Sequence, residues 1–201
     1  MKKMFLVFMI AFTMLSCSDD SSTAIAPLYL ENIQFSPYKL FFSTNGQWTK
    51  ATDSTLAIPK VSQIDFVFLF NFSESSCCLI DPITRSQLPT SYSQRTWLST
   101  AIKTKFYSTN LTVAQFEATK SDQSKIGQYF ANTNLVQLAS AGSFPEGTAY
   151  GNLQDDSQSI IADKIIGFQN VISGKRGLIW VISAPNYSPN VYLDVEIVKE
   201  K

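Results

Sequence analysis

Apolar residues follow two different patterns along the chain, and both patterns predict β-strands. Residues 64–70 (IDFVFLF) are apolar at almost every position, which is typical of a central strand covered on both faces. Residues 191–200 alternate instead, with Val191, Leu193, Val195 and Ile197 on one face and Tyr192, Asp194, Glu196 and Val198 on the other. Extended segments at 164–170 and 176–184, joined by the turn Ser173-Gly174-Lys175, precede this strand. The C-terminal part is therefore predicted to be an antiparallel β-meander.

The middle of the chain predicts two short helices in series. Residues 112–119 give the clearest signal, because Thr112 and Gln115 have the spacing of a capping box and are flanked by the apolar pair of a hydrophobic staple. A second helix follows, capped by Ser121 or Ser124. The apolar side chains of this second helix share one face: Ile126, Tyr129 and Phe130.

Before these helices the sequence alternates between extended and helical segments. Residues 39–44 favour a strand that stops at the turn pair Asn45-Gly46. Asp53 or Ser54 then caps a short helical turn, and residues 95–103 predict a further helix. We expect an α+β fold of one domain, a single mixed, largely antiparallel sheet with short helices packed on it. The alternative is a β-sandwich with helical insertions, and the helical middle favours the first arrangement.

The N-terminus has the pattern of an export signal. Lys2 and Lys3 precede the apolar run at 4–15, which is too short to span a membrane. The sequence Met14-Leu15-Ser16-Cys17 then resembles a bacterial lipobox. This resemblance implies cleavage before Cys17, a diacylglycerol on its thiol and an acyl chain on the new N-terminus. More than one acyl chain gives stable anchoring in a membrane.

The segment after the cysteine, Ser18-Asp19-Asp20-Ser21-Ser22, is too polar to bury apolar surface and predicts a solvated tether. It also resembles the acidic signal with which Bacteroidetes send lipoproteins to the outer face of the outer membrane. That resemblance implies a surface-exposed protein, and the alternative orientation faces the periplasm. The expected organisation is a signal peptide at 1–16, a lipidated cysteine with flexible tether at 17–27, and one globular domain at 28–201.

Composition and charge exclude several classes of function. The 201 residues include 16 basic and 16 acidic side chains and no histidine. A neutral balance argues against a nucleic-acid binder, and the absence of histidine excludes imidazole catalysis and histidine-ligated metals. Because Lys2 and Lys3 leave with the signal, the mature chain is slightly acidic. We therefore expect the acyl chains, and not a polybasic segment, to hold it on the membrane.

Residues that could perform chemistry are few. Asp155-Asp156 lies in a polar loop predicted at 142–159, where a solvated pair is expected and a calcium contact is the alternative. Asp65, at the start of a strand, is expected to reach solvent or a backbone N–H. The basic Gly174-Lys175-Arg176-Gly177 lacks the spacing of a phosphate-binding loop and predicts a hairpin. Adjacent Cys77 and Cys78 predict two small strand residues, with a strained vicinal disulfide as the alternative. We expect no metal, no cofactor and no enzymatic activity.

Three stretches together resemble an uncharacterised group of Bacteroidetes lipoproteins. They are Asn45-Gly46-Gln47-Trp48 with Ile64-Asp65-Phe66, then Thr104-Lys105-Phe106 with Leu111-Thr112-Val113-Ala114-Gln115-Phe116, and Gly167-Phe168 with Gly174-Lys175-Arg176-Gly177-Leu178-Ile179. The resemblance implies a shared fold and a surface location, and it implies no catalytic residues.

Aromatic residues in or beside predicted turns are the candidate ligand-binding residues: Trp48, Tyr92, Trp97, Tyr150 and Tyr187. Such rings beside polar groups are common in sugar-binding surfaces, although each ring could also belong to the core. The leading hypothesis is a non-enzymatic surface lipoprotein that binds a polysaccharide. The second hypothesis is a structural or adhesive module that binds a cell-surface protein, and the third is a hydrolase that uses carboxylates alone.

Overall fold

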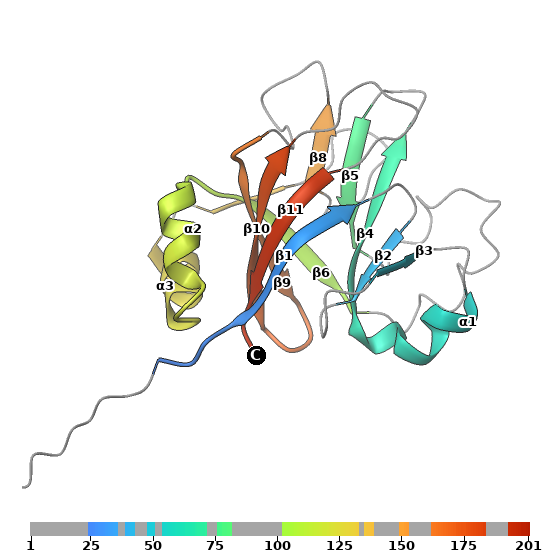
Figure 1. The fold of residues 1–201 in the computed structure, drawn as a ribbon, viewed down its shortest axis with the longest axis horizontal. Helices are drawn as coiled ribbons and strands as arrows, with labels where there is room; N and C mark the ends of the chain where they lie inside the picture. Colours follow the sequence, from blue (N-terminus) through green and yellow to red (C-terminus); the bar gives the residue numbers. More distant parts are fainter. Residues whose placement is uncertain are drawn as a thin grey trace, which may run out of the picture.

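The protein consists of three layers, in which two helices cover one sheet and a second sheet covers its other face (Figure 1). The computed structural model describes residues 24–35, 39–42, 48–50, 54–71, 76–81, 102–132, 135–138, 149–152, 162–183 and 193–201. None of the helices in this described part has the length and apolar character needed to cross a membrane.

The larger sheet has six strands in the order β1-β11-β10-β9-β6-β7, and every neighbouring pair is antiparallel. Its strands are β1 (Leu28–Phe35), β6 (Thr104–Ser108), β7 (Val136–Gln137), β9 (Ile165–Asn170), β10 (Arg176–Ser183) and β11 (Leu193–Lys199). Consecutive strands β9, β10 and β11 lie side by side, so the predicted C-terminal β-meander is confirmed. The turn between β9 and β10 requires Gly174, whose φ of 73° is a left-handed conformation that glycine adopts without strain.

The smaller sheet has five strands in the order β3-β2-β4-β5-β8, again all antiparallel. Its strands are β2 (Lys39–Phe42), β3 (Trp48–Lys50), β4 (Ile64–Asn71), β5 (Ser76–Ile80) and β8 (Ala149–Asn152). Strand β4 is the central strand that the continuous apolar run predicts. A helical turn, α1 (Ser54–Ala57), and the 3₁₀ segment η1 (Ile58–Gln63) lead into it.

The predicted α+β class is confirmed, with antiparallel strands and short helices packed on a sheet. The number of sheets differs from the expectation, because the strands form two sheets and not one. In this respect the protein has the sheet-on-sheet layers of the alternative arrangement. The reason is that both faces of the larger sheet are apolar, and two short helices cover only one of them.

A core of aromatic and aliphatic side chains lies between the two sheets. Phe66 of β4 is fully buried, with its ring edge-on to Phe106 at 5.7 Å and to Phe168 at 5.5 Å between centroids. Such edge-to-face pairs add to the free energy gained by burying the rings. The remaining buried members come from both sheets: Phe68, Leu79, Ile166, Ile179, Val181, Val195 and Ile197.

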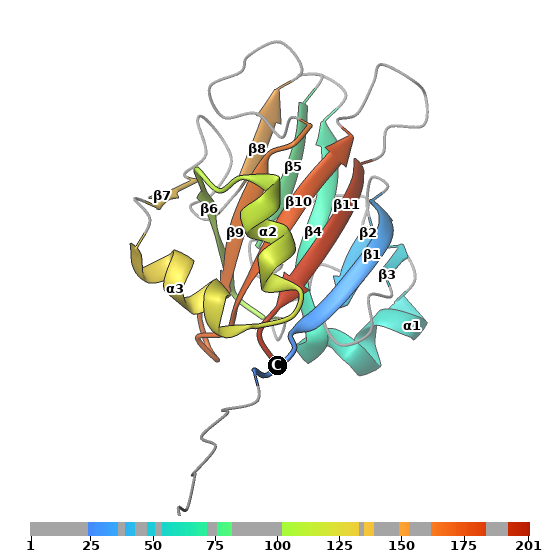
Figure 2. The ribbon, with the colours of Figure 1, turned by 60° about the vertical axis from the view of Figure 1, so that its left-hand side comes forward.

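The helices α2 (Val113–Thr119) and α3 (Ser124–Asn132) cover the opposite face of the larger sheet (Figure 2). The predicted capping box is present, because Gln115 N–H donates to Thr112 Oγ1 and Thr112 N–H donates to Gln115 Oε1 at 2.8 Å. At α3 the carboxylate of Asp122, and not a serine hydroxyl, accepts the N–H of Ser124 at 2.9 Å. The buried residues of this layer are Leu111, Phe116, Ile126, Ile165, Leu178 and Val198.

A buried ion pair joins the two sheets. Lys199, at the end of β11, donates to both carboxylate oxygens of Asp65 at 2.9 and 3.0 Å. Asp65 is 0% exposed and Lys199 only 8%. The expectation that Asp65 reaches solvent was therefore wrong, because its carboxylate is buried against the amine of Lys199. Lys199 has the same parity as the inward-facing residues of β11, so its side chain enters the space between the sheets.

We predict that Asp65→Ala or Lys199→Ala lowers the free energy of unfolding by about 3–5 kcal/mol, because each leaves the other charge buried and unpaired. Urea unfolding of the purified variants measures this change. Lys201→Ala, two residues beyond the pair and exposed, is the matched control and should change stability little. The double variant Asp65→Leu/Lys199→Met should recover most of the loss. Equal stability of the single variants and the control would contradict this account.

A second polar cluster fastens α2 to the edge of the larger sheet. Lys120 forms ion pairs with Glu196 of β11 at 2.7 Å and with Glu117 of α2 at 2.6 Å, and its amine lies over the ring of Tyr29. Burial lowers the pKa of Lys120, but the hydrogen bonds to Glu117, Glu196 and Tyr29 together raise it above its usual value. Burial raises the pKa of the Tyr29 hydroxyl, which donates to Glu196 at 2.8 Å.

This cluster should make the fold sensitive to high pH. A group whose pKa is raised on folding contributes its full stabilisation below the unfolded pKa, and this contribution is lost as the pH rises through the folded pKa. We therefore expect the free energy of unfolding to fall above about pH 10, and to fall less steeply in Lys120→Met. Urea unfolding at several pH values measures both slopes, with Lys125→Met on α3 as control. Parallel slopes for wild type and Lys120→Met would contradict the expectation.

Candidate functional site

One end of the molecule brings together segments from the whole length of the chain. We call it the tether end and define it by residues 24–28, the segment α1–η1, the turn 171–175 and residues 199–201. Figures 1 and 2 both show these segments at the same end, beside the C-terminus. Backbone hydrogen bonds hold them there, because Gln123 N–H donates to the carbonyl of Ile25 and Lys201 N–H donates to Gln123 Oε1, both at 2.9 Å.

A pocket of about 500 Å³ opens at the tether end, between η1 and the β9–β10 turn, and we call it the lysine pocket. Nine residues line it: Leu28, Ser62, Ile102, Asn170, Ser173, Lys175, Lys199, Glu200 and Lys201. Its volume lies within the range of pockets that bind small molecules. Three lysines and one glutamate among nine lining residues make it a polar site with an excess of positive charge.

The wall that carries Lys175 is a well-ordered turn. The side chain of Asn170 accepts the N–H groups of Ile172 at 2.8 Å and Ser173 at 3.0 Å, and its carbonyl accepts the N–H of Gly174 at 2.9 Å. The hydroxyl of Ser173 in turn accepts the N–H of Lys175 at 3.3 Å. Asparagine and serine favour such turns because their side chains bond the local backbone. The turn therefore places Lys175 at the edge of the pocket without requiring a ligand.

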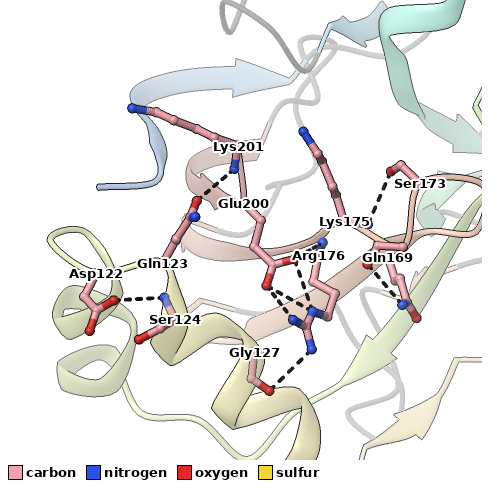
Figure 3. A network of polar contacts seen from close by, with 11 residues as sticks. Asp122, Gln123, Ser124, Gly127, Gln169, Ser173, Lys175, Arg176, Glu200 and Lys201 are labelled. Atoms are coloured by element: carbon pink, nitrogen blue, oxygen red, sulfur yellow. Dashed lines mark hydrogen bonds and ion pairs between the residues drawn. The ribbon is translucent and has the colours of Figure 1, made fainter. Parts of the chain in front are cut away.

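An arginine–glutamate pair lies beside both pockets, since Glu200 lines each of them and Arg176 lines the neighbouring one (Figure 3). Arg176 Nη2 donates to Glu200 Oε1 at 2.7 Å, and the backbone N–H of Arg176 donates to Glu200 Oε2 at 2.9 Å. The guanidinium also lies over the ring of Phe130, 5.8 Å from its centroid. Gly127 leaves it room, since a Cβ there would come within 2.7 Å of Arg176 Nη2. Glu200 is thereby fixed and its charge is balanced.

The neighbouring pocket, of about 570 Å³, differs in charge. It is lined by Ala24, Ile25, Asp122, Gln123, Ser124, Gly127, Arg176 and Glu200. Hydrogen bonds from the side chain and backbone N–H of Ser124 lower the pKa of Asp122, so this carboxylate is negative at neutral pH. Since Arg176 and Glu200 balance each other, this second pocket keeps one negative charge and does not favour an anion.

The lysine pocket keeps the opposite charge. Lys199 is paired with Asp65, and Glu200 is paired with Arg176. Neither Lys175 nor Lys201 has a side-chain ion pair within the described ranges. Ammonium groups without a carboxylate partner attract carboxylate, sulfate or phosphate groups. The geometry of the tether end therefore suits an anionic group in the lysine pocket and not in its neighbour.

Of the five aromatic residues proposed from the sequence, the two that lie in described strands are not on neighbouring strands. Trp48 begins β3 and Tyr150 lies in β8, and these strands form opposite edges of the smaller sheet. Tyr92, Trp97 and Tyr187 lie outside the described residues, as does Cys17, the predicted lipidation site.

Several other sequence predictions concern residues that the structure describes only in part. Cys77 and Cys78 lie in β5 as predicted, whereas Asp155-Asp156 and most of the helix predicted at 95–103 fall on residues that are not described. Residues 102 and 103 of that segment are described and are not helical. Trp180 is partly buried against Phe116, at 5.8 Å between ring centroids, and its Nε1 has no hydrogen-bond partner among the described residues. Among the described residues, no three or more acidic or cysteine side chains lie together in a way that could hold a metal ion.

Sequence reasoning did not identify the lysine pocket as a site. The one available signal was Gly174-Lys175-Arg176-Gly177, which predicted a hairpin, and this segment does connect β9 to β10. Ser62 lies more than one hundred residues before this segment and Lys201 more than twenty residues after it, so no local motif joins them. Only the packing of the two sheets brings them to one pocket.

Comparisons with known proteins identify a shared fold and no family. No protein-family model and no curated protein matches the chain. A crystal structure of a DUF4466 family protein from Parabacteroides merdae ATCC 43184 is similar, with a TM-score of 0.51 and 11% sequence identity. The similarity covers 86% of this chain and 53% of that chain, so this chain spans about half the length of that protein. The chain therefore shares its fold with an uncharacterised protein of the Bacteroidetes, the group that its sequence resembles.

Proposed function

We propose that the protein is a lipid-anchored, non-enzymatic binding protein of the outer membrane surface, and that its ligand is a saccharide with an acidic group. The observation that supports this proposal most directly is the lysine pocket, in which Lys175 and Lys201 have no carboxylate partner among the described residues. The lipobox-like sequence before Cys17 supports the anchor, and the acidic tether supports the surface location. The fold shared with a protein of Parabacteroides is consistent with an origin in the Bacteroidetes.

Carboxylate catalysis has no support at this site, because its carboxylates are already bonded to cations. Asp65 is buried against Lys199, and Glu200 accepts several hydrogen bonds from Arg176. A glycoside hydrolase needs two carboxyl groups that face one cleft and exchange protons with the substrate. Carboxylates fixed by strong cations do not meet this requirement, so binding is the better proposal.

An acidic ligand fits the geometry better than a neutral sugar held by stacked rings. A stacking platform would need two aromatic side chains on the same surface, and Trp48 and Tyr150 lie on strands at opposite edges of their sheet. The lysine pocket is instead lined by Lys175 and Lys201 together with the polar residues Asn170 and Ser173, and the two lysine side chains extend to separate points (Figure 3). A carboxylate or sulfate on a saccharide would bind such groups by charge-assisted hydrogen bonds.

The second candidate, an adhesive module that binds a surface protein, would use the edges of the sheets. In the described part these edges are poor templates for an added strand. Strand β1 has an irregularity between Leu30 and Ile33, where Asn32 has a φ of 55°, and the other edge of the larger sheet is the two-residue β7. Bulged and very short edge strands oppose pairing with another chain. We therefore keep this function as the alternative outcome of the binding test.

The anchor predicts that Cys17→Ser abolishes incorporation of radiolabelled palmitate and moves the protein from the membrane fraction to the soluble fraction. Cys77→Ser is the control, since it removes a thiol from β5 and should keep the label. Asp19→Asn/Asp20→Asn should keep the label but reduce digestion by protease added to intact cells. Label retained in Cys17→Ser, or missing from the wild type, would overturn the anchor.

The ligand class predicts saturable binding of the lipid-free mature chain, Cys17→Ser over residues 17–201, to an acidic polysaccharide and not to its neutral counterparts. Isothermal titration calorimetry measures the affinity. Lys175→Gln/Lys201→Gln should weaken it about a hundredfold, because each of the two lost hydrogen bonds to a charged group contributes about 1.5 kcal/mol. Lys125→Gln on α3 is the matched control and should leave the affinity unchanged.

Two other results would redirect the proposal. Loss of binding in Trp48→Ala or Tyr150→Ala, with no effect of the lysine variants, would return the site to the aromatic residues. Absence of binding to every polysaccharide, together with a reproducible neighbour in cross-linking on intact cells, would support the adhesive module instead.

A further inference from the structure

We propose that the tether end docks on the membrane surface, with the apolar tip of the β9–β10 turn in the lipid interface and an anionic lipid head group in the lysine pocket. This inference rests on the proposed anchor at Cys17 and goes beyond the proposed ligand. It assigns the anionic group in the lysine pocket to the membrane itself and not to a free saccharide. Three independent features of the tether end support it: the length of the tether, the exposed apolar side chains and the lysines beside them.

The tether keeps this end of the protein close to the lipid. Residues 17–24 reach at most about 25 Å, because an extended chain advances no more than about 3.6 Å per residue. The described chain begins at residue 24, and the carbonyl of the next residue, Ile25, is bonded to Gln123 at the tether end. A lipid on Cys17 therefore confines the tether end, and no other end of the molecule, to the neighbourhood of the membrane.

Large apolar side chains are exposed at this end. Ile172 is 76% and Val171 44% exposed at the tip of the β9–β10 turn, a place where polar residues are usual. Three more exposed apolar residues lie on the segments that define the tether end, namely Ile25, Leu56 and Ile58. The two other exposed apolar residues of the described part, Val136 and Ile182, lie on β7 and near the far end of β10. An apolar rim concentrated at one end indicates an interaction surface.

Lysines flank the apolar tip. Lys175 ends the turn, and Lys103 lies beside it, because its carbonyl accepts the N–H of Val171 at 2.7 Å. Both lysines are exposed. Glu200 is neutralised by Arg176 and Asp65 by Lys199, and the buried Asp81 accepts the N–H of Thr104, the residue after Lys103. Apolar residues beside cations are the pattern of protein surfaces that lie in the interface of anionic membranes.

Docking in this way gives the lysine pocket its occupant. Asn170 and Ser173 line the pocket and are the residues on either side of the exposed tip. Insertion of the tip therefore brings the mouth of the pocket to the depth of the lipid head groups, where phosphate is the commonest anionic group. We assign an anionic phospholipid head group to the lysine pocket. The experiment distinguishes it from a free acidic saccharide, which carries a similar anionic group.

The test uses the lipid-free mature chain, Cys17→Ser over residues 17–201, and vesicles of phosphatidylcholine alone or mixed with phosphatidylglycerol. Co-sedimentation measures the partition coefficient. We expect binding to the mixed vesicles and little to phosphatidylcholine alone. Lys175→Gln should lower the partition coefficient about fivefold, because a lysine at an anionic surface contributes about that factor. Ile172→Ser should lower it about tenfold through lost apolar burial.

Ile182→Ser is the matched control, because it removes the same exposed side chain from the opposite end of the neighbouring strand β10, and it should not change the partition. Circular dichroism checks that each variant is folded, as expected for changes at exposed positions. Absence of binding to the mixed vesicles overturns the inference, and so does an equal effect of Ile172→Ser and Ile182→Ser.

Titration with a soluble acidic polysaccharide distinguishes failure of this inference from failure of the proposed function. Binding of the polysaccharide without binding of the vesicles would keep the proposed function and overturn the membrane docking. Vesicle binding that depends on Ile172 and Lys175, without polysaccharide binding, would support the docking and remove the free saccharide as ligand.

Discussion

The buried ion pair between Asp65 and Lys199 is the constraint on which the tether end depends. Two charges removed from water are tolerated only where they meet with good geometry, so the pair fixes how the start of β4 lies against the end of β11. Thr104 strengthens the same junction, because its hydroxyl donates to the carbonyl of Asp65 at 2.6 Å. Strands from both sheets are thereby held in one arrangement, and the two residues that follow Lys199 leave β11 in a defined direction.

The chemistry of the lysine pocket follows from these fixed pairs. Glu200, next to Lys199, turns to Arg176, which is held by Gly127 and Phe130 of α3. Once Lys199 and Glu200 are balanced, the charge that remains at the pocket belongs to exposed lysines on its edge. A surface that is slightly acidic as a whole can therefore present a locally basic site. Charge balance over the whole sequence would not reveal this, because the relevant quantity is which charges are already paired.

The architecture also relates the anchor to the site. The chain enters the domain at the end where the β9–β10 turn and the C-terminal residues lie, so a tether attached there orients the whole domain (Figure 1). With the proposed anchor, the end of β10 and the start of β11 would lie on the side away from the membrane. The protein from Parabacteroides shares the fold, but the similarity covers only 53% of that chain, so this arrangement is argued from the present chain and is not transferred from that protein.

The sequence by itself determined the local elements. Alternation in β11, the continuous apolar run of β4, the capping box at Thr112 and the turn at Gly174 each follow from interactions between neighbours along the chain, and each was predicted correctly. Tertiary structure alone decided that the strands form two sheets, since the coverage of a sheet's second face depends on segments far apart in sequence. It also decided that Asp65 is buried, because its partner Lys199 lies 134 residues away. The lysine pocket was also decided by the tertiary structure, since long-range packing both assembles its walls and determines which of its charges remain unpaired.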